Sequence, residues 1–102
     1  MARVIWAAPA LNELNEIAEY IALDNAQAAK KLVKQIFKST ALLQEFPESG
    51  RSPPELPTSR YRERMIGPCR VLYRHNKDAD EVYILPIVRT ERELRRYILD
   101  NR

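Results

Sequence analysis

The first half of the chain has a helical pattern of apolar and polar positions. A β-branched and aromatic run at residues 3–7 predicts a short strand, and Pro9 suits the first turn of a helix. Apolar residues then recur at spacings of three and four, which places them on one face of that helix. This face holds Leu11, Leu14, Ile17, Ala18 and Ile21.

A second helical pattern follows at once. Asn25 is a good N-cap residue, and the pattern that it opens ends near Phe46, before Pro47 and Gly50. Its apolar stripe consists of Leu32, Val33, Ile36, Phe37, Thr40 and Leu43. Two amphipathic helices joined by a tight turn predict a helical hairpin, and both stripes must pack on another apolar element.

The second half of the chain supplies that element as strands. Four prolines within residues 47–60 predict a stiff, extended connection. Strands are expected at 61–66, 70–75 and 82–88, and the short loops between them predict an antiparallel meander. Because proline cannot donate a ladder hydrogen bond, Pro86 predicts a third strand that lies at an edge, is bulged or is shortened.

A short helix closes the predicted fold. Thr90 and Glu93 have the spacing of a capping box, and Leu94 and Ile98 give the helix an apolar face. We therefore expect an α+β fold of the order β-α-α-β-β-β-α, with the helical hairpin packed on one face of a small antiparallel sheet. The 102 residues make one domain, 1–102, with little volume for a deep pocket, so no cofactor is expected.

Composition narrows the class of protein further. The hydrophobic fraction of 45% is that of a globular chain, and no apolar run approaches the ~18 residues of a membrane span. The start of the chain shows no signal-peptide pattern. The single cysteine, Cys69, excludes an internal disulfide and a cysteine-based metal site. We expect a protein of the reducing cytoplasm, with no metal centre and no membrane partner.

The formal net charge of +3 hides an asymmetry along the chain. Residues 51–102 hold 12 of the 17 basic side chains, and 11 of these 12 are arginines. Five lie on or next to the first two predicted strands of the meander: Arg60, Arg62, Arg64, Arg70 and Arg74. If the hairpin covers one face of the sheet, these arginines can converge on the other face or its rim and bind phosphate or carboxylate groups. The alternative is a solvated sheet face that keeps the strands soluble.

For the other candidate residues, a structural role explains the sequence better than a functional one. A second basic group near the last helix consists of Arg89, Arg92, Arg95 and Arg96. Cations near a helix C-terminus also suit the helix dipole, and Tyr97 suits the core beside Leu94. His75, the only histidine, is expected to be an exposed structural residue rather than a general base. Cys69 lacks the partners of a nucleophile.

An ordered set of short motifs extends from residue 3 to about residue 97. Its members are Trp6, Ala10–Leu14–Ile17–Tyr20–Ile21, Pro47-x-x-Gly50-Arg51, Pro54-Glu55-Leu56, Tyr61-Arg62-Glu63, Gly67-x-x-Arg70-Val71-Leu72-Tyr73-Arg74 and Ile84-Leu85-Pro86-Ile87-Val88-Arg89. With this order and spacing, the chain resembles the RelE/ParE superfamily of bacterial type II toxin–antitoxin toxins. The resemblance implies the same fold as the periodicity. Ala7 and Cys69 depart from the family pattern, in which Ser or Thr and an aromatic residue are usual.

The resemblance implies two candidate activities. One branch of the superfamily consists of ribosome-dependent mRNA nucleases, whose basic positions correspond here to Arg62, Arg64 and Arg70. The first two positions are usually lysines in that branch, and arginine, which stays charged, is a poorer proton-transfer group. The terminal Arg/Tyr pair of that branch has no clean counterpart here: its candidates are Arg92 and Tyr97, and Tyr97 aligns only with a shift of one residue. The ParE-like branch poisons DNA gyrase and has no established catalytic residues. The long hairpin, the Pro-Glu-Leu-Pro connector and the Gly-Pro-x-Arg-Val-Leu-Tyr stretch look more like ParE.

We therefore expect a ParE-like toxin that inhibits DNA gyrase by binding, without turnover of a substrate. Its target-binding residues would be Arg62, Arg64, Arg70, Arg74, Arg89 and Arg92. A cognate antitoxin, a ParD-like or other small acidic protein, would neutralise it in a hetero-oligomer. The antitoxin-binding residues would be Leu14, Ile17, Ile21, Ile36 and Leu43. The alternatives are a RelE-like ribosome-dependent mRNA endonuclease and a non-toxic binding module that acts only with its antitoxin.

Overall fold

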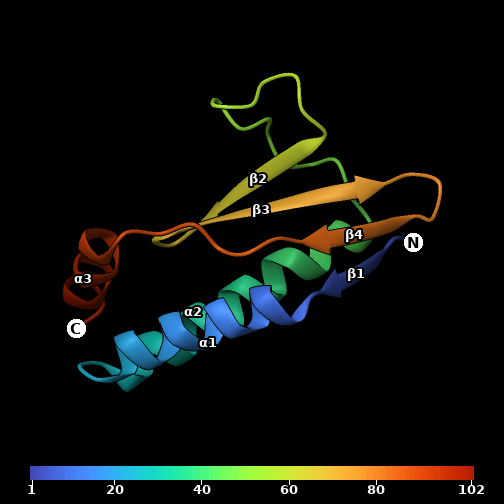
Figure 1. Cartoon of the computed structure of the whole chain (residues 1–102). Coiled ribbons are helices and arrows are strands. Elements are labelled where there is room, and N and C mark those ends of the chain that lie inside the picture. Colours follow the sequence, from blue (N-terminus) through green and yellow to red (C-terminus); the bar gives the residue numbers. More distant parts are fainter.

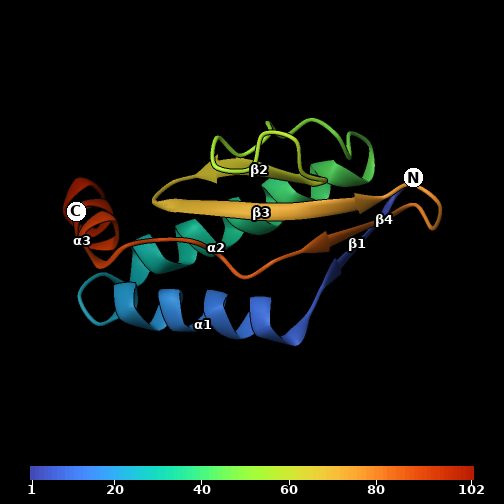
Figure 2. The same ribbon diagram turned by 45° about the horizontal axis from the view of Figure 1, so that its top comes forward.

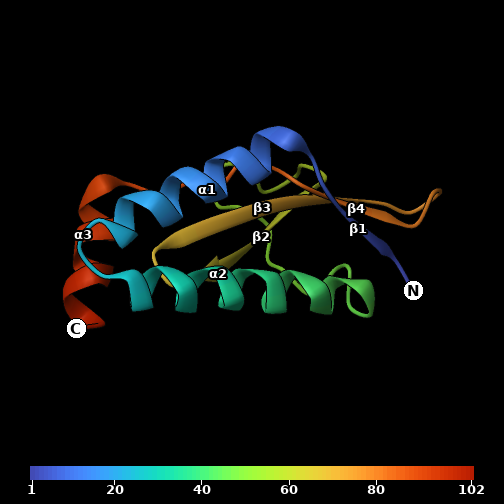
Figure 3. The same ribbon diagram turned by 90° about the horizontal axis from the view of Figure 1, so that it is seen from below.

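The computed structural model describes all 102 residues. The elements follow in the order β1 (Arg3–Trp6), α1 (Ala8–Ala22), α2 (Ala26–Ala41), the 3-10 helix η1 (Leu42–Gln44), β2 (Tyr61–Ile66), β3 (Cys69–Asn76), β4 (Glu81–Ile84) and α3 (Glu91–Asp100). Helices α1 and α2 form an antiparallel hairpin that covers one face of the sheet, and α3 lies at the end of the hairpin (Figures 1 and 3). The predicted β-α-α-β-β-β-α fold is confirmed.

The sheet is mixed rather than wholly antiparallel. Its strand order is β1-β4-β3-β2, and β2, β3 and β4 form the predicted antiparallel meander. Strand β1 pairs in parallel with β4, from Arg3 opposite Glu81 to Trp6 opposite Ile84. The expectation of an antiparallel sheet was therefore wrong for this one pair. The sequence pattern shows that β1 is a strand but does not show which strand it pairs with.

Strand β4 is short and central. It ends at Ile84, two residues before Pro86, which confirms the predicted shortening but places the strand between β1 and β3 rather than at an edge. The chain then rejoins β3 at one bridge, where Arg70 and Val88 exchange two backbone hydrogen bonds of 2.8 and 3.0 Å. The proline therefore interrupts the ladder without separating the chain from the sheet.

The core lies between the hairpin and the inner face of the sheet, the face that the helices cover. Ile17 and Ile21 of α1 and Ile36 of α2 are buried there with Tyr73 and Val82 of the sheet. Two positions of the predicted apolar stripes remain largely exposed, at 42% each, namely Leu11 and Phe37. Each helix thus buries a narrower face than the sequence pattern suggests. None of the helices is long and apolar enough to cross a bilayer.

Both predicted helix caps are present. The Asn25 side chain accepts a hydrogen bond from the Ala28 amide at 3.0 Å, and the Thr90 hydroxyl accepts one from the Glu93 amide at 3.1 Å. The Asn25 side chain also donates to the Asn101 carbonyl, which ties the end of α3 to the turn between α1 and α2. Helix α3 is therefore docked on the hairpin.

The connector, residues 47–60, passes around the edge of β2 and lies over the outer face of the sheet, the face away from the helices (Figure 2). At its start the Gly50 amide donates to the buried Tyr73 hydroxyl at 2.8 Å. A Cβ atom on Gly50 would lie 2.6 Å from that hydroxyl and 2.7 Å from the Glu63 carbonyl oxygen. This close approach of two backbone segments requires glycine.

We predict that Gly50→Ala destabilises the fold by roughly 2–4 kcal/mol, because the added methyl group displaces either the Tyr73 side chain or the β2 backbone. Urea unfolding followed by circular dichroism measures the free energy of unfolding. Thr58→Ala, an exposed change in the same connector, serves as the control and should lie within about 0.5 kcal/mol of the parent. A Gly50→Ala protein as stable as the control would contradict this packing.

Candidate target-binding surface

The strand register divides the meander arginines between the two faces of the sheet. Arg62 lies opposite Tyr73 and Arg64 opposite Val71, and both partners are core residues of the inner face. Arg70 and Arg74 lie on the outer face, opposite Met65 and Tyr61. The five arginines therefore do not converge on one face. Strand periodicity correctly predicted which arginines share a face within each strand, but the register between strands decides which faces coincide.

Arg62 and Arg64 bind groups at the rim of the inner face. Arg64 donates to the hydroxyls of Ser39 on α2 and Ser49 at 3.1 and 3.0 Å. Arg62 donates to the Gly50 carbonyl at 2.9 Å and lies 3.5 Å from a Glu48 carboxylate oxygen. These two arginines thus tie the start of the connector to β2.

On the outer face, the buried carboxylate of Glu63 binds two arginines. Glu63 is 1% exposed, and it is the only charged side chain among the buried residues. Its oxygens accept from Arg51 Nε at 2.7 Å and from Arg70 Nη2 at 2.5 Å. Arg70 also binds Glu55 of the connector through both terminal nitrogens, at 2.7 and 3.0 Å. Both terminal nitrogens of Arg70 are therefore bound to carboxylates within the chain, whereas its buried Nε atom has no partner.

The ion pairs control the protonation of this cluster. Burial alone would raise the pKa of Glu63, but hydrogen bonds from Arg70 and Arg51 outweigh it and hold that pKa below its usual value of 4.5. The separate hydrogen bonds from Arg70 to Glu55 lower the pKa of that carboxyl group as well. Both carboxylates are consequently charged at neutral pH and neutralise arginines that composition alone counts as free.

The arginines near α3 are also dispersed. Arg89 pairs with Glu13 of α1 at 2.9 Å, whereas Arg92 is exposed and has no carboxylate partner. Tyr97 is half-buried, and its hydroxyl lies 3.4 Å from the Ala28 carbonyl oxygen. The residues that the nuclease hypothesis requires therefore lie on both faces of the sheet and on α3, and they form no common site.

The five residues predicted to bind an antitoxin are buried instead. Their exposed fractions are 4% or less, and they are Leu14, Ile17, Ile21, Ile36 and Leu43. They pack between the hairpin and the sheet because the apolar stripes of both helices face the sheet. In this fold they have no side-chain surface to offer a partner, which argues against a direct contact.

The hairpin instead presents a shallow groove on its outer side. We call it the hairpin groove. Its volume is about 450 Å³, and its lining consists of Ala18, Glu19, Ala22, Ala26, Ala29, Lys30, Val33 and Lys34. Small side chains along both helices keep it open, and the two lysines lie among them. Of its four alanines, only Ala18 belongs to the apolar face predicted for the first helix, and no local pattern relates it to the alanines of the second helix.

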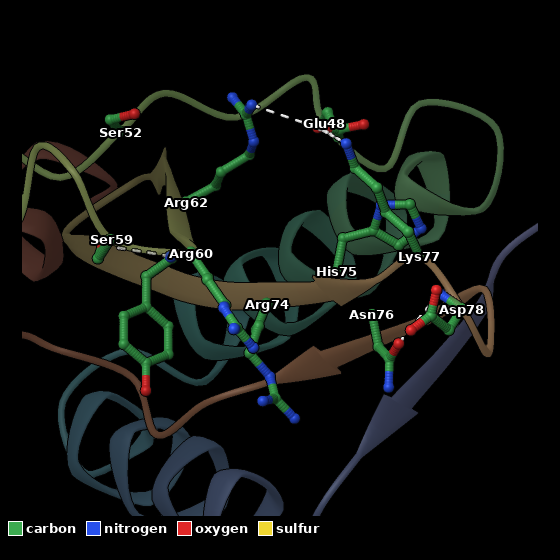
Figure 4. A pocket seen from close by; sticks show the side chains of 11 residues that line it. Glu48, Ser52, Ser59, Arg60, Arg62, Arg74, His75, Asn76, Lys77 and Asp78 are labelled. Atoms are coloured by element: carbon green, nitrogen blue, oxygen red, sulfur yellow. Dashed lines mark hydrogen bonds and ion pairs between the residues drawn. The ribbon is translucent and has the colours of Figure 1, made fainter.

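A second depression, which we call the basic hollow, lies where β2 begins and β3 ends. Its volume is about 510 Å³, and its lining consists of Glu48, Ser52, Ser59, Arg60, Tyr61, Arg62, Arg74, His75, Asn76, Lys77 and Asp78. Figure 4 shows Arg62 and Lys77 reaching toward Glu48, with Arg60 and Arg74 on the other side of the hollow. The connector, both strand ends and the turn after β3 thus contribute to one polar site.

Neither His75 nor Cys69 has the surroundings of a reactive residue. His75 is mostly buried, with a side chain that is 10% exposed, so the prediction of an exposed histidine was wrong. Its Nε2 atom lies 3.1 Å from Asp80 Oδ1, while its buried Nδ1 atom has no hydrogen-bond partner. Burial raises the pKa of the Cys69 thiol to about 11, so this residue is an inert core side chain. The chain brings no three metal-ligating side chains together.

Comparison with known proteins defines the class. The fold matches a structure described as "Chromosomal ParDE TA system from P. aeruginosa", with a TM-score of 0.73, 23% identity, and coverage of 89% of this chain and 98% of that one. A Sinorhizobium fredii protein described as "Putative toxin Y4kP" is 31% identical over 83 residues, which are 81% of this chain and 85% of the relative. The first likeness shows that the two chains share a fold, and the second relates this chain to a protein described as a putative toxin.

The family is shown by the match along the chain itself. Residues 4–94 match the family described as "ParE toxin of type II toxin-antitoxin system, parDE". The chain therefore belongs to the ParE toxin family, within the RelE/ParE superfamily that its motifs resemble.

The Glu63 cluster predicts a specific acid sensitivity. A carboxyl group whose pKa is lower in the folded chain stabilises the fold above its unfolded pKa, near 4.5, and this stabilisation disappears as the pH falls through the folded value. We expect Glu63→Gln to lower the free energy of unfolding by roughly 2–3 kcal/mol at pH 7. Between pH 7 and pH 3 this free energy should fall less in the variant than in the parent. Urea unfolding at several pH values measures both effects.

Glu16→Gln is the matched control, because Glu16 is an exposed acid on α1 with no ion pair. The free energy of unfolding of this variant should equal that of the parent at every pH. If the curve of Glu63→Gln runs parallel to that of the parent down to pH 3, the ion pairs contribute no pH-dependent stability.

Proposed function

We propose that this ParE-family chain inhibits DNA gyrase by surface contact and is neutralised by a cognate antitoxin. The observation that carries the proposal is the set of arginines that lack a carboxylate partner on a chain of this family. Arg60 and Arg74 lie in the basic hollow, and Arg92 is exposed on α3. Such side chains are available to an acidic protein surface or to DNA phosphates in the gyrase–DNA complex.

The arrangement of the remaining arginines supports binding rather than turnover. A nuclease must hold its charged groups around one scissile phosphate, but Arg64 is bound to serines and Arg70 to two carboxylates. Arg92 and Tyr97 belong to α3, and no hydrogen bond or ion pair joins them to Arg64 or Arg70. No observation favours an endonuclease site, so inhibition by contact is the simpler mechanism.

The internal contacts also narrow the target-binding set. Of the six arginines predicted from the sequence, Arg70 and Arg89 have short ion pairs within the chain and Arg64 is hydrogen-bonded to serines. Arg62 has one longer ion pair, with Glu48 at 3.5 Å. We therefore assign the principal contacts to Arg74 and Arg92, with Arg62 in a supporting role.

We predict that the purified chain blocks supercoiling of relaxed plasmid by DNA gyrase. The double change Arg74→Gln and Arg92→Gln should raise the concentration for half-inhibition roughly tenfold, because two charged contacts are removed. The charge-matched double variant Lys38→Gln and Arg95→Gln should inhibit like the parent, because Lys38 lies on α2 and Arg95 pairs with Glu91.

A translation assay run beside the supercoiling assay separates the alternatives. Unimpaired supercoiling at large molar excess would remove the gyrase proposal. New mRNA 5′ ends on translating ribosomes would support the nuclease hypothesis instead. Normal growth on strong expression of soluble protein without the antitoxin would favour the non-toxic binding module.

For the antitoxin, we propose a small acidic ParD-like protein whose apolar and acidic segment occupies the hairpin groove. The alanines of the groove allow a helix to approach closely, and Lys30 and Lys34 can pair with acidic residues beside its apolar face. The buried stripe residues would then support the groove from beneath without touching the partner.

This placement predicts that association with the antitoxin slows as salt rises. We expect the association rate to fall on the order of tenfold between low and high salt, because ions screen the attraction between the lysines and the acidic partner. Stopped-flow measurements with the small acidic protein encoded by the neighbouring reading frame would test it. Changing Lys30 and Lys34 to Gln should flatten the salt dependence more than Lys38→Gln, and an association rate independent of salt would contradict the electrostatic argument.

A further inference from the structure

The basic hollow contains arginines that have no anionic partner within the chain. Seven arginines elsewhere or at its rim pair with carboxylates: Arg3, Arg51, Arg62, Arg70, Arg89, Arg95 and Arg102. The guanidinium groups of Arg60 and Arg74 have neither an ion pair nor a hydrogen bond, and both line the hollow. Two uncompensated charges that share one concave site attract an anion from solution.

Arg74 is held in place before any ligand arrives. It lies in register between Tyr61 of β2 and Tyr83 of β4, so the three side chains form a row across the outer face. Its guanidinium carbon lies 5.4 Å from the centre of the Tyr83 ring. A side chain that is already ordered loses less conformational entropy when it binds a ligand.

His75 adds a buried polar atom that the fold leaves without a partner. Its side chain is 10% exposed, Nε2 lies 3.1 Å from Asp80, and Nδ1 makes no hydrogen bond. When the imidazole is cationic, both nitrogens donate, and Asp80 accepts from only one of them. His75 also lines the hollow, so its imidazole reports on an anion that binds there.

The acidic residues of the hollow only partly offset its cations. Glu48 and Asp78 face Arg60, Arg62, Arg74 and Lys77 around the lining. Glu48 is the shared acid of two long ion pairs, 3.5 Å to Arg62 and 3.6 Å to Lys77. Contacts of this length are weak, so Lys77 can turn toward a stronger acceptor, whereas Arg62 is also held by the Gly50 carbonyl.

We propose that the basic hollow is a phosphate-binding site, with Arg60 and Arg74 as its main ligands, Lys77 as a further donor, and Arg62 and His75 in its lining. Cations on several walls suit the tetrahedral oxygens of phosphate. A carboxylate, by contrast, is satisfied by one guanidinium group, as Glu55 is by Arg70. The phosphate could be free or part of a nucleic-acid backbone. This site goes beyond gyrase inhibition, because it predicts binding by the isolated chain.

NMR of the isolated chain tests the site directly, because His75 is the only histidine and gives one set of imidazole resonances. Inorganic phosphate should shift these resonances and the Asn76 and Lys77 amide signals, with saturation and a dissociation constant on the order of 1–10 mM. Sodium chloride and sodium acetate at matched ionic strength are the reference titrations. A short DNA duplex in a parallel titration distinguishes the two sources, because backbone phosphates should shift the same signals at lower concentration.

Arg60→Gln and Arg74→Gln should each weaken phosphate binding about tenfold, whereas Arg96→Gln, an unpaired arginine of α3 outside the hollow, should not change it. Circular dichroism checks that each variant is folded. Equal shifts with acetate, or unchanged binding by both hollow variants, would overturn the proposal. Phosphate binding without gyrase inhibition would contradict the proposed function but support this site. Gyrase inhibition without phosphate binding would contradict only the site.

Discussion

The architecture of the outer face depends on one buried carboxylate. Glu63 could not remain charged at 1% exposure without partners, and it obtains them from Arg51 of the connector and Arg70 of β3. The backbone of Arg51 also exchanges two hydrogen bonds with Glu63, so the connector continues the sheet beyond β2 at this point. A segment rich in proline, with no helix or strand of its own, thereby acquires a defined path over the sheet.

That path determines which positive charges the protein can use. It commits Arg51 and Arg70 to internal ion pairs, and it brings Ser52 and Ser59 to the wall of the basic hollow. The charge that remains for a partner is smaller than the composition suggests, but it is concentrated at defined places. Localised charge favours a specific partner, because a uniformly basic surface would bind any polyanion with little discrimination.

Most of the fold could be predicted from local sequence, and most of the site could not. Periodicity, Asn25, Thr90 and Pro86 report on neighbouring residues, and the helices, caps and shortened strand follow from them. The parallel pairing of β1 and the faces occupied by Arg62 and Arg70 depend on strand register, which long-range packing sets. Leu14 and Ile36 are buried against the sheet, which their pattern could not reveal, because an apolar stripe looks the same whether it meets a sheet or another protein. The hollow combines segments about 30 residues apart, from Glu48 to Asp78, and no local pattern joins them.

The burial of Cys69 has a practical consequence for work on this toxin. Maleimides and disulfide reagents react with an accessible thiolate, and this thiol is fully enclosed with a pKa near 11. The folded chain therefore does not react with thiol-directed labels, and Cys69 need not be replaced before labelling. A cysteine introduced at Ser52 or at an alanine of the hairpin groove would become the sole reactive position, and a fluorophore or spin label there would report on one surface at a time.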